Sequence, residues 1–165
     1  MTGSECTGKT TLAVALAAHY ETVWVPEHAR QFVIDKGAPP EYGDVEAIAR
    51  GQIALEDEKT AEASHFLIQD TDLFSTILYS RHYYGECPSW IEEAFQSRAA
   101  DLYLLADIDI PWVPDGKQRD RGARREEMHE LFRSGLIARR LTFAEIRGSH
   151  RDRLDAAVSA VDGLT

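Results

Sequence analysis

The chain has 165 residues, a length that suits one compact domain, and hydrophobic residues make up 44% of it, enough for an ordinary buried core. This composition excludes a disordered chain. Its formal net charge of −10 argues against a broad surface for nucleic acid or acidic membranes, because such partners require a large positive footprint. A phosphate-bearing ligand must therefore be bound by a local group of residues.

The two cysteines and the hydropathy pattern bear on location. Cys6 and Cys87 form no CxxC pair and no Cys/His zinc spacing. No apolar run approaches the ~18 residues of a membrane span, and the chain begins without a charged and apolar leader. We expect a reducing, cytoplasmic environment, soluble partners and no membrane contact.

Helical and strand patterns alternate along the chain. Residues 9–20 are rich in Ala and Leu and predict a helix, whereas the β-branched and aromatic stretch 22–25 predicts a short strand. The other expected elements are helices at 27–36, from 44, after 70 and from 88 to 98, strands at 65–69, 102–106 and 141–146, an arginine-rich segment at 115–130, and a last helix that buries Leu154, Ala157, Val158 and Val161. This alternation indicates an α/β fold with a parallel sheet, whose ligand sites lie at the carboxyl ends of the strands.

The segment from Gly3 to Thr10 matches the phosphate-binding pattern GxxxxGK[ST] in full, and the helix that should follow it does follow. Its glycines let successive backbone N–H groups point at a phosphate, and the helix N-terminus adds partial positive charge. Lys9 is expected to neutralise the β- and γ-phosphates of ATP, and the Thr10 hydroxyl to ligate Mg²⁺. A glycine-rich turn without nucleotide is the alternative. The predicted nucleotide-binding residues are Gly3, Ser4, Glu5, Cys6, Thr7, Gly8, Lys9, Thr10, Thr11 and, further along, Arg124.

The motif indicates a three-layer P-loop NTPase sandwich, which we expect to be nucleoside-kinase-like, with residues 1–165 as one domain and a lid at about 115–130. A P-loop normally follows a buried strand, yet only two residues precede Gly3. We therefore expect the first strand to be truncated in this sequence.

Two acidic residues follow the strand expected at 65–69. Asp70 stands where a carboxylate reaches the metal or its water shell, so we predict that Asp70 and Thr10 hold Mg²⁺. Asp72 either accepts the proton of a substrate hydroxyl or supplies the N-terminal charge of the next helix.

Glu27 and Arg30 follow the strand at 22–25 and can share the edge of the sheet with the phosphates. There they are expected to reach a phosphoryl acceptor. The alternative is an ion pair on the surface of a helix, with i,i+3 spacing.

Four arginines, Arg119, Arg121, Arg124 and Arg125, lie within seven residues of an otherwise acidic chain. Arginines on a lid that closes over the γ-phosphate stabilise the charge of the transition state, and we favour this interpretation over a solvated helix face. Arg119 and Arg125 are the preferred contacts. With Lys9 and Asp72 they form the predicted catalytic set.

Trp112 follows the strand at 102–106 in a loop, outside any apolar period. It either stacks on the aromatic base of a substrate or covers the edge of the core, the commoner role of tryptophan.

Several stretches together, in this order, resemble one family: GSECTGKTTLA, WVPEHAR, FLIQDTD and DIPWVPDGKQRDRGARREEMHELF. They are similar to the ribosylnicotinamide kinase domain of NadR-type NAD-salvage proteins and to the related NadR-like AAA-type ATPase domains. The P-loop alone is generic, whereas its combination with the other three stretches is specific.

This resemblance implies that ATP phosphorylates the ribose 5′-hydroxyl of nicotinamide riboside. It places Asp72 and Glu27 with Arg30 nearest the ribose, makes Trp112 the candidate partner of the nicotinamide ring, and assigns Arg119, Arg124 and Arg125 to the lid. The alternatives are a kinase for another nucleoside or small alcohol, and an ATP-binding switch that phosphorylates no acceptor.

Overall fold

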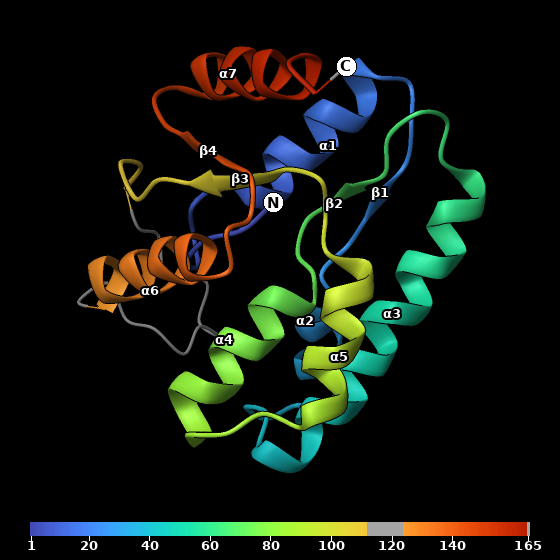
Figure 1. The fold of residues 1–165 in the computed structure, drawn as a ribbon, viewed down its shortest axis with the longest axis vertical. Coiled ribbons are helices and arrows are strands. Elements are labelled where there is room, and N and C mark those ends of the chain that lie inside the picture. Colours follow the sequence, from blue (N-terminus) through green and yellow to red (C-terminus); the bar gives the residue numbers. More distant parts are fainter. Residues whose placement is uncertain (112–123, 165) are drawn as a thin grey trace.

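The structure is a computed structural model that describes residues 1–111 and 124–164. Its helices and strands alternate along most of the chain (Figure 1). In order they are α1 Lys9–His19, β1 Trp24–Val25, α2 His28–Lys36, the 3₁₀ turn η1 Tyr42–Asp44, α3 Val45–Glu62, β2 Ile68–Gln69, α4 Leu73–Tyr84, α5 Ser89–Arg98, β3 Tyr103–Ala106, α6 Arg125–Ala138, β4 Phe143–Ile146 and α7 His150–Asp162.

The strands form two parallel pairs with the first residues of the chain between them. β1 pairs with β2 and β3 pairs with β4. The Thr2 N–H donates to the carbonyl of Leu104, and Ala106 donates to the carbonyl of Thr2, each at 2.9 Å. On the other side the Met1 amino group donates to the Gln69 carbonyl. The spatial order is therefore β1, β2, residues 1–2, β3 and β4, and the predicted parallel sheet is confirmed.

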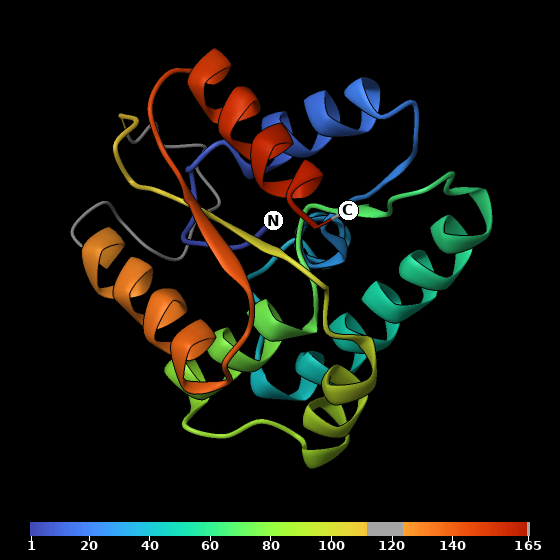
Figure 2. The same ribbon diagram turned by 45° about the horizontal axis from the view of Figure 1, so that its top comes forward.

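Helices cover both faces of this sheet (Figures 1 and 2). The side chains of β3 alternate between the two faces, as a pleated strand requires. Tyr103 and Leu105 pack with α3, α4, α5 and α6, whereas Leu104 packs with α1 and α7. The result is the three-layer α/β sandwich of a P-loop NTPase.

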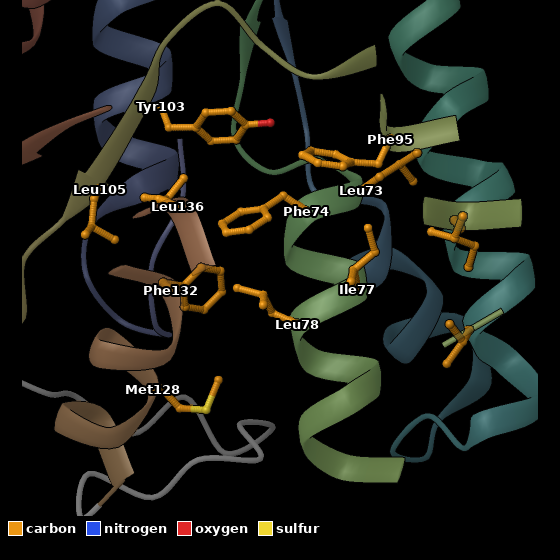
Figure 3. Packing of buried hydrophobic residues seen from close by; sticks show 13 residues of the cluster. Leu73, Phe74, Ile77, Leu78, Phe95, Tyr103, Leu105, Met128, Phe132 and Leu136 are labelled. Carbon is orange, nitrogen blue, oxygen red and sulfur yellow. The ribbon is translucent and has the colours of Figure 1, made fainter. Parts of the chain in front are cut away.

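The larger core cluster centres on Phe74 at the start of α4 (Figure 3). Its ring meets those of Phe95, Tyr103 and Phe132 at centroid separations of 5.9, 5.5 and 6.0 Å. Such contacts add about 0.5–1.5 kcal/mol per pair beyond burial of apolar area. This cluster anchors the first turn of α4, which directly follows the two predicted acidic site residues.

The helices expected at 9–20, 27–36 and 88–98 are confirmed within one or two residues at each end. Helix α6 differs from expectation, because the segment 115–130 was predicted as a charged lid. Its described part, 124–130, begins a helix whose Met128, Phe132 and Leu136 are fully buried. Residues 115–123 of the predicted lid lie outside the described residues.

Cys6 and Cys87 are half-buried and form no disulfide within residues 1–111 and 124–164. Among the residues that the structure describes, no helix is long and apolar enough to cross a membrane.

Glu56 on α3 is a buried acid, only 3% exposed, with an oxygen 3.1 Å from the Arg98 guanidinium. Burial raises the pKa of the Glu56 carboxyl from 4.5 to about 7, against the opposing hydrogen bond from Arg98. Between these values the unfolded chain releases this proton while the folded chain keeps it. The contribution of Glu56 to stability is therefore present below about pH 4.5 and is lost as pH rises to 7.

We predict that Glu56→Gln removes this pH dependence of the unfolding free energy. The unfolding free energy of the variant relative to the parent should shift in favour of the variant by up to about 3 kcal/mol between pH 4.5 and 8, since one pKa unit corresponds to about 1.4 kcal/mol. Urea denaturation across this range measures it, with the exposed Glu58→Gln on the same helix as control. Parallel pH profiles of the variant and the parent would contradict the prediction.

Candidate active site

The predicted phosphate-binding loop has the backbone that its glycines imply. Gly3 has φ of 126°, and a Cβ there would lie 3.0 Å from the Ala106 carbonyl oxygen. Gly8 has φ of 77° and is the N-cap residue of α1, where a glycine offers no side chain to bind the first N–H groups of the helix. The first N–H groups of α1 are therefore left for an anion, the arrangement that favours phosphate at a helix N-terminus.

Lys9 lies at the start of α1, and its ammonium donates to the Ser4 carbonyl at 2.6 Å. The Thr7 hydroxyl donates to the same carbonyl at 2.8 Å, which closes the loop on itself. Burial lowers the pKa of Lys9, and the carboxylates of Glu27 and Asp70 are the largest charges that oppose this shift. The acidic neighbours of Lys9 therefore favour its charged form while no phosphate is bound.

Thr10 and Asp70, the two residues predicted to hold Mg²⁺, are in direct contact. The Thr10 hydroxyl donates to Asp70 Oδ2 at 2.6 Å, across the start of α1 and the end of β2. Asp70 is 3% exposed, and its other oxygen, Oδ1, is buried with no hydrogen-bond partner among the described residues. A hydroxyl and a carboxylate with an uncommitted oxygen suit Mg²⁺, which prefers oxygen ligands and uses few from the protein. No group of three or more His, Cys, Asp or Glu side chains fit to bind a metal occurs in the described ranges.

A cavity of about 320 Å³ opens beside the loop. Lys9 and Glu5 line it on the loop side, and Glu27 and Arg30 of α2 line it next to them. Arg30 lies 3.5 Å from the Glu27 carboxylate, and Glu27 is 27% exposed. The structure therefore brings the loop and the predicted acceptor pair to one cavity. Helix α4 supplies another part of its lining, which includes Tyr79, Tyr83 and Tyr84.

Asp72 does not line this cavity. It is 5% exposed and forms the N-cap of α4, where Oδ1 accepts from the Phe74 N–H at 3.1 Å and Oδ2 accepts from the Tyr103 hydroxyl at 2.7 Å. Burial raises the pKa of Asp72, while the hydrogen bonds from Tyr103 and from the backbone of Ser75 and Phe74 lower it. These contacts match the alternative in which Asp72 supplies the charge at the start of the next helix.

The predicted lid residues are only partly described. Arg125 begins α6, and its guanidinium donates to the carbonyl of Ile110 at 3.0 Å and to that of Cys6, within the phosphate-binding loop, at 3.4 Å. Arg124 precedes α6 and is exposed. Trp112, Arg119 and Arg121 lie outside the described residues.

Arg153 on α7 is a site residue that the sequence analysis missed. Its buried guanidinium donates to the Thr7 carbonyl at 2.8 Å, to those of Asp107 and Gly148 at 3.0 Å, and pairs with Asp109. One side chain therefore joins the phosphate-binding loop to the ends of β3 and β4. A signal existed, because Arg153 shares the buried stripe of α7 with Ala157 and Val161 at i+4 and i+8.

Comparison with known proteins places this site in a family. A family model described as AAA domain matches residues 1–153. The trifunctional NAD biosynthesis/regulator protein NadR of Escherichia coli K12 is 26% identical over 155 residues, which cover 91% of this chain and 38% of the relative. NadR of Salmonella typhimurium LT2 is 27% identical over 144 residues, 82% of this chain and 35% of the relative. The chain thus spans little more than a third of these curated relatives.

Two solved structures share the fold. A crystal structure of NadR protein in complex with NR matches with a TM-score of 0.79 at 22% identity, over 98% of this chain and 49% of that one. A crystal structure of NadR protein in complex with NAD and AMP-PNP matches with a TM-score of 0.73, also at 22% identity, over 98% and 47%. Because the family model covers most of the chain, the chain belongs to this AAA domain family, and the sequence and fold similarities show that it has a NadR-like P-loop domain.

Proposed function

We propose that this domain is a small-molecule kinase that transfers the γ-phosphoryl group of ATP to the ribose 5′-hydroxyl of nicotinamide riboside. One observation carries the proposal: Lys9 of the phosphate-binding loop and Glu27, the N-cap residue of α2, line the same cavity of about 320 Å³. A phosphate cradle that shares a cavity with a carboxylate is the arrangement that phosphoryl transfer to a hydroxyl requires.

The chain's own groups have separate roles in this proposal. The N–H groups at the start of α1 and the Lys9 ammonium bind and orient the phosphates, while Thr10 and Asp70 hold Mg²⁺. When bound, Mg²⁺ neutralises charge that develops on the phosphate oxygens. Glu27 accepts the proton of the acceptor hydroxyl as that oxygen bonds to the γ-phosphorus, the bond to the bridging oxygen breaks, and ADP leaves.

The tyrosine-lined part of the cavity suits a flat ring that is uncharged or cationic. Tyr79, Tyr83 and Tyr84 line it together with apolar residues such as Val33 and Pro39. Tyrosine faces are electron-rich and attract cationic rings such as the pyridinium of nicotinamide riboside. The similarity to NadR proteins, one of them solved in complex with NR and another with AMP-PNP, supports this acceptor and ATP as the donor.

The lid completes the proposal. Arg119 and Arg125 are proposed to stabilise the transferred phosphoryl group, Arg124 to bind the nucleotide, and Trp112 to stack on the nicotinamide ring. Arg125 supports this through its contact with Cys6, because it already lies against the phosphate-binding loop.

The test is an acceptor panel. The purified chain is incubated with ATP, Mg²⁺ and nicotinamide riboside, other nucleosides or small alcohols, and products are followed by mass. We expect a product heavier by one phosphoryl group with nicotinamide riboside. If only another nucleoside were phosphorylated, the proposed acceptor would change to that nucleoside. If phosphate were released from ATP at the same rate with or without each acceptor, the proposed kinase activity would be overturned.

A pair of variants separates Glu27 from Asp72 as the residue that serves the acceptor. We predict that Glu27→Gln lowers kcat by about 10²-fold or more, because it removes the proton acceptor and keeps the shape. Affinity for a non-hydrolysable ATP analogue should stay within about twofold of the parent value. Asp72→Asn should lower the melting temperature and change kcat little. Its oxygens accept from the Phe74 N–H at the start of α4 and from the Tyr103 hydroxyl, so they serve the fold.

Single-turnover kinetics with saturating acceptor and calorimetry of analogue binding measure both effects. The exposed Glu58→Gln is the matched control for the loss of one carboxylate. The reverse pattern, with normal turnover in Glu27→Gln and a large loss in Asp72→Asn, would return Asp72 to the chemistry and remove Glu27 from it.

A further inference from the structure

Gln52 on α3 is a buried polar residue at the edge of the cavity, only 2% exposed. Both ends of its amide are bonded. Its Oε1 accepts from the His28 backbone N–H at 2.9 Å, and its Nε2 donates to the Thr71 carbonyl at 3.2 Å. Only one orientation of the amide satisfies the His28 N–H donor on one side and the Thr71 carbonyl acceptor on the other, so the side chain is held in a single position.

The two backbone partners of Gln52 adjoin the site residues. His28 is the first residue of α2 and follows Glu27 directly, and Thr71 follows Asp70 directly. One amide therefore links the end of β1, which carries the acceptor carboxylate, to the end of β2, which carries the metal carboxylate. β1 and β2 pair over only two residues each, so the sheet itself fixes this relation weakly.

The Glu27 carboxylate is not committed to capping its own helix. Glu27 is the N-cap residue of α2, yet its side chain makes no capping hydrogen bond. A capping carboxylate would accept from the second or third N–H group of the helix, whereas Gln52 binds the first, at His28. The Glu27 carboxylate instead lines the cavity and lies 3.5 Å from Arg30.

Gly51, the neighbour of Gln52, shows how closely the two helices meet. A Cβ at this position would lie 2.0 Å from His28 Nε2. The imidazole of His28 therefore packs directly against the backbone of α3. The N-terminus of α2 is fixed at His28 twice, through the ring and through the N–H group.

From these contacts we propose that Gln52 is a positioning residue, which sets the acceptor carboxylate of Glu27 relative to Asp70 and the phosphate-binding loop. The proposal rests on the proposed function, in which Glu27 serves the acceptor. Gln52 itself need not touch the substrate. Its loss should impair the transfer step and leave nucleotide binding intact, because the loop and Thr10 do not depend on it.

The test compares Gln52→Met with the parent. Methionine keeps the length of the side chain and removes both hydrogen bonds. We expect kcat to fall between about 10- and 100-fold, the effect of a misplaced group near the reacting atoms. The dissociation constant of an ATP analogue should change less than about twofold. Gln96→Met, at an exposed position on α5, is the matched control. An unchanged kcat, or equal losses of kcat and analogue affinity, would overturn the proposal.

Two further variants keep the test decisive if Gln52→Met folds poorly. In Gln52→Glu the new carboxyl still accepts from His28 but donates to Thr71 only when protonated. The titratable and charged groups near it are Glu56 with its partner Arg98, the His28 imidazole against Gly51, and the residues Glu5, Lys9, Glu27 and Arg30 that line the same cavity. Its kcat relative to the parent should therefore rise as pH falls, and a flat ratio would count against the proposal. Gly51→Ala should displace His28 and reproduce the loss of kcat by a different route.

The acceptor panel tells failure of the function from failure of this proposal. If the parent chain phosphorylates no acceptor, the proposed kinase activity is refuted. The rate of hydrogen exchange at the His28 amide then measures its hydrogen bond to Gln52 directly. Faster exchange in Gln52→Met, with other amides of α2 unchanged, supports the positioning role. Exchange equal to that of the parent overturns it.

Discussion

Replacement of Lys9 with alanine should abolish phosphoryl transfer. The Lys9 ammonium is the cation at the start of α1 that faces the cavity, and the carboxylates of Glu27, Asp70 and Glu5 surround it. Without it these three acids repel the phosphates of ATP at close range. Loss of one preorganised donor costs about 10²–10³ in kcat, and loss of a full charge should cost at least about 10³.

Initial rates with ATP, Mg²⁺ and the best acceptor of the panel measure this loss, and calorimetry measures nucleotide affinity. Lys59→Ala on α3 is the control, because Lys59 pairs only with exposed acids of its own helix in the described structure. The melting temperature of Lys9→Ala should not fall, since burial already lowers the pKa of Lys9. A Lys9→Ala chain with more than about a tenth of the parent turnover would contradict the assigned role.

The phosphate-binding loop and the helix after it could be predicted because their constraints are local. Positive φ at Gly3 and Gly8 and a lysine at the helix start are requirements that a short sequence pattern records. The pairing of Thr10 with Asp70 was also predictable, since carboxyl ends of parallel strands meet at one edge.

Helix α6 was missed although its pattern is in the sequence. Met128, Phe132 and Leu136 recur every four residues and are fully buried, but they stand among charged residues that favoured a lid. Arg153 was missed because the last helix was assigned a buried face from its apolar residues alone, whereas this arginine is buried through four polar partners.

Gln52 could not be predicted from any periodicity. Its role depends on how α2 and α3 meet, which follows from Gly51 and the imidazole of His28 rather than from a motif. Asp72 shows another limit, because the sequence supported two roles and did not reveal the contacts with Phe74 and Tyr103 that bear on the choice between them.

Arg153→Met should destabilise the fold and loosen the phosphate-binding loop together. The guanidinium is 5% exposed and bonds three backbone carbonyls, all of which lose a charged donor in the variant. Burial of Asp109 raises its pKa, but the Gly148 N–H and Arg153 outweigh this and hold the pKa of Asp109 below its usual value. Asp109 is 35% exposed, so the main cost is the loss of the buried hydrogen bonds from the charged guanidinium to the carbonyls. A hydrogen bond to a charged group contributes about 1.5–3 kcal/mol, and loss of at least one lowers the melting temperature of a chain of this length by roughly 3–12 °C.

The loss should extend to nucleotide binding, because the Thr7 carbonyl is one of the partners and Thr7 lies within the loop that faces the phosphates. We expect the affinity for an ATP analogue to fall roughly tenfold or more, measured by calorimetry well below the melting temperature. Arg153→Lys should be intermediate, because an ammonium keeps the charge and cannot reproduce the fork of a guanidinium. Arg151→Met is the matched control on the same helix, at a side chain that is 89% exposed. If Arg153→Met had the melting temperature of the parent and bound the analogue equally well, the prediction would be wrong. The shape of the loop would then depend on its own glycines and on Lys9.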